Sequence, residues 1–107
     1  MQRRRLLLLD NRTSLAGSLI EMGSLRYTPA GIPALNFHIA HSSTQEEAGV
    51  ARKVECEMAC VTLGSTAQLL AGAKPGTEVK LSGFLAAKSL KSRIPILHVD
   101  TIEFLEG

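Results

Sequence analysis

Glycine and proline punctuate this chain so often that the runs between them are mostly short. Both residues disfavour the interior of regular secondary structure and favour turns, so they mark where elements end. The interruptions fall at Gly17, Gly23, Pro29, Gly31, Pro33, Gly49, Gly64, Gly72, Pro75, Gly76, Gly83 and Pro95. Runs of this length suit strands better than long helices, which predicts a protein built mainly from β-structure.

Five of these runs are predicted to be strands. Most of them alternate between apolar and polar side chains, as expected when one face of a strand is buried. The predicted strands are Thr13–Met22, Ala34–His41, Val54–Leu63, Glu78–Lys88 and Pro95–Leu105. In the third, the even-numbered residues from Val54 to Cys60 share one face, which we expect to pack inward. The fifth is apolar in both phases, which predicts a slip in register near Asp100.

Only one segment, Ser65–Ala71, is predicted to be helical, with Ser65 as its N-cap and Gly72 as its stop. Gly17 in the first strand and Gly83 in the fourth can bend sharply, as closure of a small barrel requires. The element order predicts an all-β fold, a five-stranded oligonucleotide-binding (OB) barrel with a short helix or turn between strands three and four. An SH3-like barrel and half of an immunoglobulin-type sandwich are the alternatives.

The composition fits one globular domain. Apolar residues make up 45% of the chain, charged residues 21%, and the net charge of +2 is compatible with nucleic acid without implying it. Two cysteines provide no disulfide framework, which favours a reducing compartment. The four leucines at residues 6–9 are too few for a signal peptide, and no segment suits a membrane span. We therefore expect a cytoplasmic protein with an N-terminal extension at residues 1–10 and an OB-fold domain at residues 11–107.

The two cysteines are the most obvious candidates for chemistry, but their spacing argues against a metal site. On an extended strand Cys56 and Cys60 lie about 13 Å apart, at ~3.3 Å per residue, too far for one zinc ion. Strand alternation sends His38 and His41 to opposite faces, so they do not complete a zinc site or a Cys–His nucleophile. We expect both thiols to act as small buried hydrophobic groups.

No other pattern indicates an enzyme. Glu46 and Glu47 are predicted to lie in a polar loop, and Glu55 and Glu57 to point outward from a strand, where solvation explains them. The glycines do not gather into a phosphate-binding loop. The sequence therefore predicts a binding protein without catalytic residues, metal or cofactor.

Cations and aromatic rings gather around the fourth predicted strand and the loop after it. Proteins that bind single strands use cations to contact phosphates and rings to stack on bases. The candidate nucleic-acid-binding residues are Arg12, Arg26, Tyr27, Lys80, Phe84, Lys88, Lys91 and Arg93. The same pattern also fits a Phe84 that plugs one end of the barrel and lysines that only solubilise the surface.

Several short motifs, taken in order, resemble the bacterial single-stranded-DNA-binding protein family. They are N-R-T-S-L-A-G-S-L, L-R-Y-T-P-A-G-I-P-A-L-N-F-H-I-A-H, Q-E-E-A-G, C-E-M, G-T-E-V-K-L-S-G-F-L and I-L-H-V-D-T-I-E. More narrowly, Asn11 to Glu106 resembles the family of primosomal replication protein N (PriB). Each motif alone is weak, whereas the ordered set with its spacing is fairly specific.

The resemblance implies an OB-fold homodimer that binds single-stranded DNA during replication restart. It also implies contacts with the primosomal helicase PriA and the primosome protein DnaT. In that family DNA crosses the strand faces and reaches the hairpin between the fourth and fifth strands. The basic character of that hairpin is kept here by Lys88, Lys91 and Arg93.

The chain departs from the family pattern at two positions. Glu55 stands where the best-known members carry a DNA-contacting Trp, and Ser42 stands where they carry Arg. A stacking ring and a phosphate-binding cation are both missing, so we expect DNA contact to shift toward the basic hairpin. The alternative is a protein-interaction adaptor with little DNA binding, whose acidic face at Glu55 and Glu57 meets a basic helicase surface.

Overall fold

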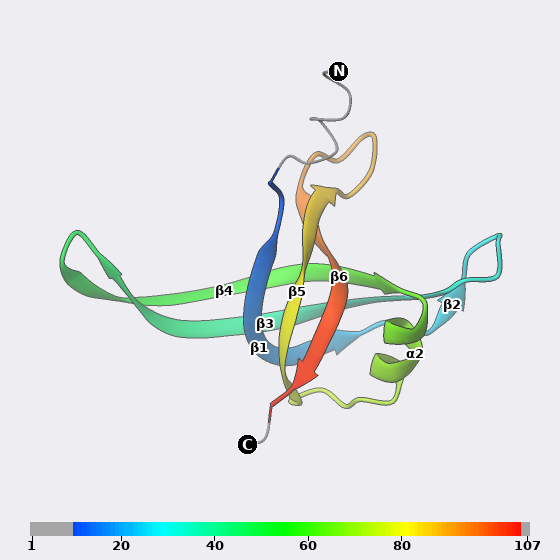
Figure 1. Cartoon of the computed structure of the whole chain (residues 1–107), viewed down its shortest axis with the longest axis horizontal. Helices are drawn as coiled ribbons and strands as arrows, with labels where there is room; N and C mark the ends of the chain where they lie inside the picture. The colour runs from blue at the N-terminus through cyan, green and yellow to red at the C-terminus, as the bar shows by residue number, and fades with distance from the viewer. Residues whose placement is uncertain (1–9, 106–107) are drawn as a thin grey trace.

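The computed structural model describes residues 10–105. Residues 1–9, nearly all of the predicted extension, and residues 106–107 lie outside the described residues. Within the described range the chain forms six strands and one short helix (Figure 1). They are β1 (Thr13–Met22), β2 (Arg26–Tyr27), β3 (Pro33–Glu47), β4 (Val50–Leu63), α2 (Ser65–Ala71), β5 (Glu78–Ala87) and β6 (Pro95–Phe104).

Five of the strands close into a barrel. Hydrogen-bonded neighbours follow the order β1, β5, β6, β4 and β3, and β3 returns to pair with β1. The pairs are antiparallel except for β4 and β6, which run parallel where Cys60 lies beside Leu97. β2 is a two-residue addition that pairs with the start of β3. The predicted all-β, five-stranded OB barrel with its single short helix is confirmed.

Two glycines allow the barrel to close. A Cβ added at Gly17 would meet the carbonyl oxygen of Ala40 at 2.4 Å, and one added at Gly83 would meet that of His98 at 1.9 Å. Only a residue without a side chain lets two backbones approach this closely. The bends predicted at these glycines are therefore the places where β1 crosses β3 and β5 crosses β6.

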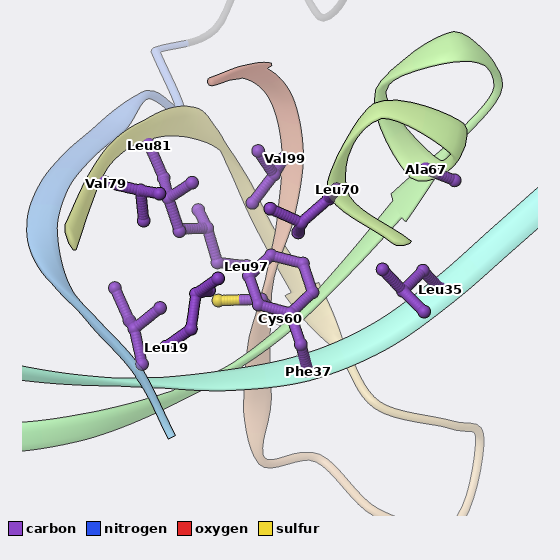
Figure 2. Close-up of a cluster of buried hydrophobic side chains, with 11 residues drawn as sticks. Leu19, Leu35, Phe37, Cys60, Ala67, Leu70, Val79, Leu81, Leu97 and Val99 are labelled. Carbon is purple, nitrogen blue, oxygen red and sulfur yellow. The ribbon is translucent and has the colours of Figure 1, made fainter. Parts of the chain in front are cut away.

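A mostly aliphatic core with one aromatic ring, Phe37, fills the barrel, with side chains from every barrel strand and from α2 (Figure 2). Its buried members are Leu19, Leu35, Phe37, Ile39, Cys60, Ala67, Leu70, Val79, Leu81, Leu97 and Val99. The buried hydroxyl of Thr62 donates to the carbonyl oxygen of Val99 (2.8 Å) and lies 2.6 Å from the hydroxyl of Thr66. This chain of hydrogen bonds ties the first turn of α2 to β6 without leaving a buried polar group unpaired.

The start of α2 differs from the prediction by one residue. Ser65 is the first helical residue, and the N-cap is Gly64, whose φ is 79° and which has no side-chain cap. The turn out of β4 needs a left-handed residue, and glycine supplies it at no steric cost. The carbonyl oxygen of Gly64 then accepts from the N–H groups of Ala67 (3.0 Å) and Gln68 (3.3 Å). Gly72 ends the helix as predicted.

β3 and β4 are longer than predicted and form a projecting hairpin. The connecting turn contains only Ala48 and Gly49, with φ of 54° and 81°, so β3 runs on to Glu47 and β4 begins at Val50. Two-residue turns with positive φ match the twist of paired strands, which explains why the ladder continues to the tip. The glutamates predicted in a loop are therefore strand residues. We call residues 41–57 the arm, and Figure 1 shows it extending far to one side of the barrel.

The arm leaves Cys56 outside the core. Alternation places Cys56 and Cys60 on the same face, as predicted, but only Cys60 is buried. Cys56 pairs with His41, one residue beyond Ala40, where the pairing of β3 with β1 stops, and its thiol is exposed. The prediction that both thiols pack inward is wrong for Cys56, because the core ends before the strand does. Burial raises the pKa of the Cys60 thiol to about 12.

The register slip predicted near Asp100 is present. β5 and β6 shift register between Ser82 and Gly83, which leaves Asp100 as the extra residue of a β-bulge. The bulge turns its carboxylate toward Arg12, whose guanidinium donates to both carboxylate oxygens (2.8 and 3.1 Å) and to the Ser82 hydroxyl (3.1 Å). This hydrogen bond to Arg12 lowers the pKa of Asp100 below its ordinary value.

Replacement of Gly83 by Ala should destabilise the barrel by about 3 kcal/mol, because the new methyl group must displace the backbone of His98. Urea unfolding measures the change. Gly72→Ala is the matched control, since a Cβ there meets nothing within 4 Å and the φ of −87° is ordinary. Equal unfolding midpoints for the two variants would contradict the close approach.

The two thiols should react at different rates with an aromatic disulfide reagent at neutral pH. Cys56 is exposed and should react promptly, whereas Cys60 is buried with a raised pKa and should react only after unfolding. We expect one fast equivalent in the native protein, two in urea, and no fast equivalent in Cys56→Ser. Two equal native rates would contradict the burial of Cys60.

The contribution of Asp100 to stability should depend on pH. A carboxyl group whose folded pKa is lowered stabilises the protein above its unfolded value, about 3.9, and loses that effect as pH falls through the lower folded value. Asp100→Asn should therefore melt at a lower temperature than the parent at pH 7, and the two melting temperatures should begin to converge only as pH falls below about 4. A difference that persists unchanged at low pH would exclude the ion pair as its cause.

Candidate nucleic-acid interface

The loop between β5 and β6, residues 88–94, presents a cluster of exposed cations. Lys88, Lys91 and Arg93 all lie on it, and within residues 10–105 none of the three has an ion-pair partner. The backbone N–H of Lys88 donates to the carbonyl oxygen of Ile94 (2.9 Å), which closes the loop at its base. We call this segment the basic loop. Its cations are held on a short connection and are free to contact phosphates.

An aromatic pair lies on β5 and β6, the two strands that the basic loop connects. Phe84 on β5 and His98 on β6 are cross-strand partners, and their rings are stacked with centroids 5.0 Å apart and planes 8° from parallel. Phe84 is 41% exposed, so it faces outward. The alternative in which Phe84 plugs the end of the barrel is therefore wrong: Gly83 and Leu85, its neighbours, occupy the inward phase.

The other predicted cations on this side of the barrel have more neighbours of opposite charge. Arg12 is engaged with Asp100 and Ser82, as described above. Lys80 is exposed on β5, where its cross-strand partner on β6 is Glu103. Arg12 lies beside Ser82, midway along β5, and Lys80 lies near the start of β5, at the end of the strand away from the basic loop. Neither adds an isolated positive charge beside that loop.

Arg26 and Tyr27 lie on a different part of the molecule. They form β2, which Figure 1 shows at the opposite side from the arm and away from the basic loop. The Arg26 guanidinium donates to the side-chain oxygen of Asn36 (2.8 Å), and Tyr27 is 60% exposed. The structure therefore places Lys88, Lys91 and Arg93 on one loop and Phe84 on the strand that leads into it, but leaves the predicted pair on β2 apart from them.

The outward face of the arm is acidic. Glu55 lies directly opposite Ser42, so the two positions that depart from the family pattern are cross-strand neighbours at one place. The next outward position on β4 is Glu57, which is also exposed. The arm's cations are occupied: Lys53 lies 3.9 Å from Glu55, and an Arg52–Glu47 pair closes at 2.6 Å. This face therefore offers neither a stacking ring nor an unpaired cation to a phosphate backbone.

The histidines and cysteines are dispersed. The two ring nitrogens of His41 lie 2.7 Å from the carbonyl oxygen of Ala16 and 2.8 Å from the hydroxyl of Ser43. His38 lies 3.3 Å from a Glu21 carboxylate oxygen. Among residues 10–105 no three His, Cys, Asp or Glu side chains gather as metal ligands would.

Sequence reasoning missed His98 and Asn11. His98 lies in a run that is apolar in both phases, and only the β5–β6 register reveals that it faces Phe84. The Asn11 side chain extends the ladder past the end of β1, donating to the carbonyl oxygen of Leu85 (2.9 Å) and accepting from its N–H (3.0 Å). Neither residue has a local sequence signal, since both roles depend on pairing over long separations.

Comparison with known proteins places this fold in a family. Residues 11–101 match a family model described as another single-strand binding protein family. The replication restart protein PriB of Bordetella pertussis is 39% identical over 97 residues, which cover 91% of each chain. The solved structure of the priB protein from Ralstonia solanacearum is 34% identical with a TM-score of 0.82, and the match covers 92% of this chain and 100% of that one. The wild-type single-stranded DNA binding protein from Thermus aquaticus is 25% identical with a TM-score of 0.73, matched over 92% of this chain and 51% of its own.

These matches cover nearly the whole barrel and include both sequence identity and three-dimensional similarity. Across the described residues no helix is long and apolar enough to cross a bilayer, and α2 has only seven residues. The closed five-stranded barrel agrees with the overall similarity to the solved structures. The chain therefore belongs to the single-strand binding protein family, among the replication restart proteins PriB.

Proposed function

We propose that this protein binds single-stranded DNA as an accessory protein of the replication-restart primosome, without catalytic activity. The observation that carries the proposal is the basic loop, where Lys88, Lys91 and Arg93 are exposed and unpaired within residues 10–105. Cations of this kind bind phosphates without reading sequence, so binding is sequence-tolerant and falls steeply with salt. The names of the family and of the curated relatives support the same role.

The remaining predicted residues contribute less. Arg12, Arg26 and Lys80 are secondary phosphate contacts, because each already has a carboxylate or amide neighbour. Tyr27 and Phe84 are the rings that stack on bases. DNA on this path runs past the basic loop and avoids the acidic face of the arm, where carboxylates at Glu55 and Glu57 repel phosphates.

The proposal includes partners and location. The protein acts in the cytoplasm as a homodimer and bridges single-stranded DNA to the primosomal helicase PriA and the primosome protein DnaT. The arm suits such contacts, because it projects from the barrel and β4 pairs with β6 only over Cys60–Thr62. The backbone groups along the outer edge of β4 within the arm are thus available to a partner strand.

A second candidate is a primosomal protein-interaction adaptor with weak or vestigial DNA binding. The outward carboxylates at Glu55 and Glu57 favour it, because Glu55 and its cross-strand neighbour Ser42 replace the residues expected to contact DNA. This role predicts no measurable affinity for DNA at low salt together with co-purification of the helicase.

Triple replacement of Lys88, Lys91 and Arg93 by Ala should weaken binding of a labelled oligothymidine of about 30 nucleotides at least tenfold. It should also reduce the slope of log affinity against log salt by about 2, because each lost contact with a single strand removes roughly 0.7 of slope. Fluorescence anisotropy over a salt series measures both quantities.

The matched control removes three exposed cations elsewhere, in R52A/K53A/K74A, so that the net charge changes equally. An equal loss in both triple variants would show that total charge, not the basic loop, carries binding. If the parent protein binds no DNA at low salt but still co-purifies with the helicase, the adaptor role is correct and the proposed DNA-binding function is wrong.

A further inference from the structure

We propose that Phe84 and His98 together form a stacking site for one nucleobase of the bound strand. This inference rests on the proposed function and assigns a specific chemical task within it. Phe84 acts with a partner ring, and His98 becomes part of the binding surface. The ligand is an unpaired base, recognised by its flat π face rather than by its hydrogen-bonding edge.

The geometry of the pair is suited to this task. The two rings are nearly parallel, 8° apart in plane, with centroids separated by 5.0 Å, which is an offset stack rather than an edge-to-face contact. A parallel stack is a column that a third flat ring can extend. Phe84 remains 41% exposed although His98 covers part of it, so the ring retains accessible surface for a base.

The pair is held rigidly before any ligand arrives. On one side of Phe84, the neighbouring Leu85 backbone is fixed by two hydrogen bonds to the Asn11 side chain (2.9 and 3.0 Å). On the other side, the carbonyl of His98 passes so close to Gly83 that no side chain fits between them. Little conformational freedom is left to lose on binding, which favours affinity.

The position of the pair relative to the cations completes the site. Lys88 follows Phe84 by four residues on nearly extended backbone, a separation of about 13 Å at ~3.3 Å per residue. A strand whose phosphates contact the basic loop therefore passes within reach of the rings. Tyr27 lacks this combination, since it lies on β2 away from the loop and is not stacked on another ring in the described structure.

A purely structural role for the pair makes a different prediction. Cross-strand aromatic pairs stabilise sheets, so loss of Phe84 lowers stability whether or not a base stacks there. The experiment must therefore compare ligands with and without bases. An abasic strand keeps the sugar-phosphate backbone and its charges but offers nothing to stack.

The test compares Phe84→Leu with the parent on a 20-nucleotide oligothymidine and on an abasic strand of equal length. We expect Phe84→Leu to bind oligothymidine about fivefold or more weakly, because one stacked base is lost, and to bind the abasic strand as the parent does. The salt dependence should not change, since no phosphate contact is removed. His98→Ala should show the same selective loss, and it provides a second variant if Phe84→Leu fails to fold.

Phe104→Leu is the matched control. Phe104 lies on β6, is 42% exposed like Phe84, and pairs at the other end of the ladder with Val79. Its replacement should leave binding of both strands unchanged, and thermal unfolding establishes that all variants are folded.

Two outcomes overturn the inference while leaving the proposed function intact. In the first, the parent binds DNA through the basic loop and Phe84→Leu binds oligothymidine with the same affinity. The aromatic pair would then serve stability or a protein partner and not a base. The other is an equal loss on both strands, which would mean that Phe84 only positions the basic loop. A parent that binds neither strand at low salt removes the proposed function itself.

Discussion

The barrel depends on two places where backbones touch without side chains between them. At Gly83 the carbonyl oxygen of His98 occupies the space of a Cβ, and at Gly17 that of Ala40 does the same. These approaches draw β5 onto β6 and β1 onto β3, so the sheet curves far enough to close. The closure at Gly83 also brings Phe84 against His98 and leaves Asp100 bulged toward Arg12. One steric constraint therefore shapes both the core and the surface beside the basic loop.

Although the net charge is only +2, unpaired positive charge is concentrated on the basic loop and exposed carboxylates on the arm. The basic loop carries three cations without ion-pair partners in the described structure, whereas the arm's cations are matched by carboxylates. A phosphate backbone is attracted to the first and gains nothing from the second. The two surfaces lie on different projections of the barrel (Figure 1), so the proposed contacts with DNA and with a protein partner do not overlap.

Local patterns were sufficient to predict the barrel but not its surface. Alternation and glycine spacing located all five barrel strands and the helix, and the double apolar phase of the last strand correctly placed the slip at Asp100. Alternation correctly predicts that Cys56 and Cys60 share one strand face. It cannot show where the core ends, so the prediction that Cys56 is buried is wrong. The arm was missed because its polar residues resemble a loop, and its two-residue turn lacks an Asn-Gly signal. His98 has no local signal, since its partner is set by register. The assignment of individual side chains to DNA remains a prediction.

The strand order means that the barrel cannot close until late in synthesis on the ribosome. β6, the last strand among residues 10–105, lies between β5 and β4 and completes the ring. Until residues 95–104 have left the ribosome, β4 and β5 both have unpaired edges, and the core lacks the side chains that β6 contributes. At about 5–20 residues per second, that exposed interval lasts on the order of seconds. Loss of the last strand by truncation or proteolysis would recreate the same half-built sheet, with two unpaired edges ready to join another chain.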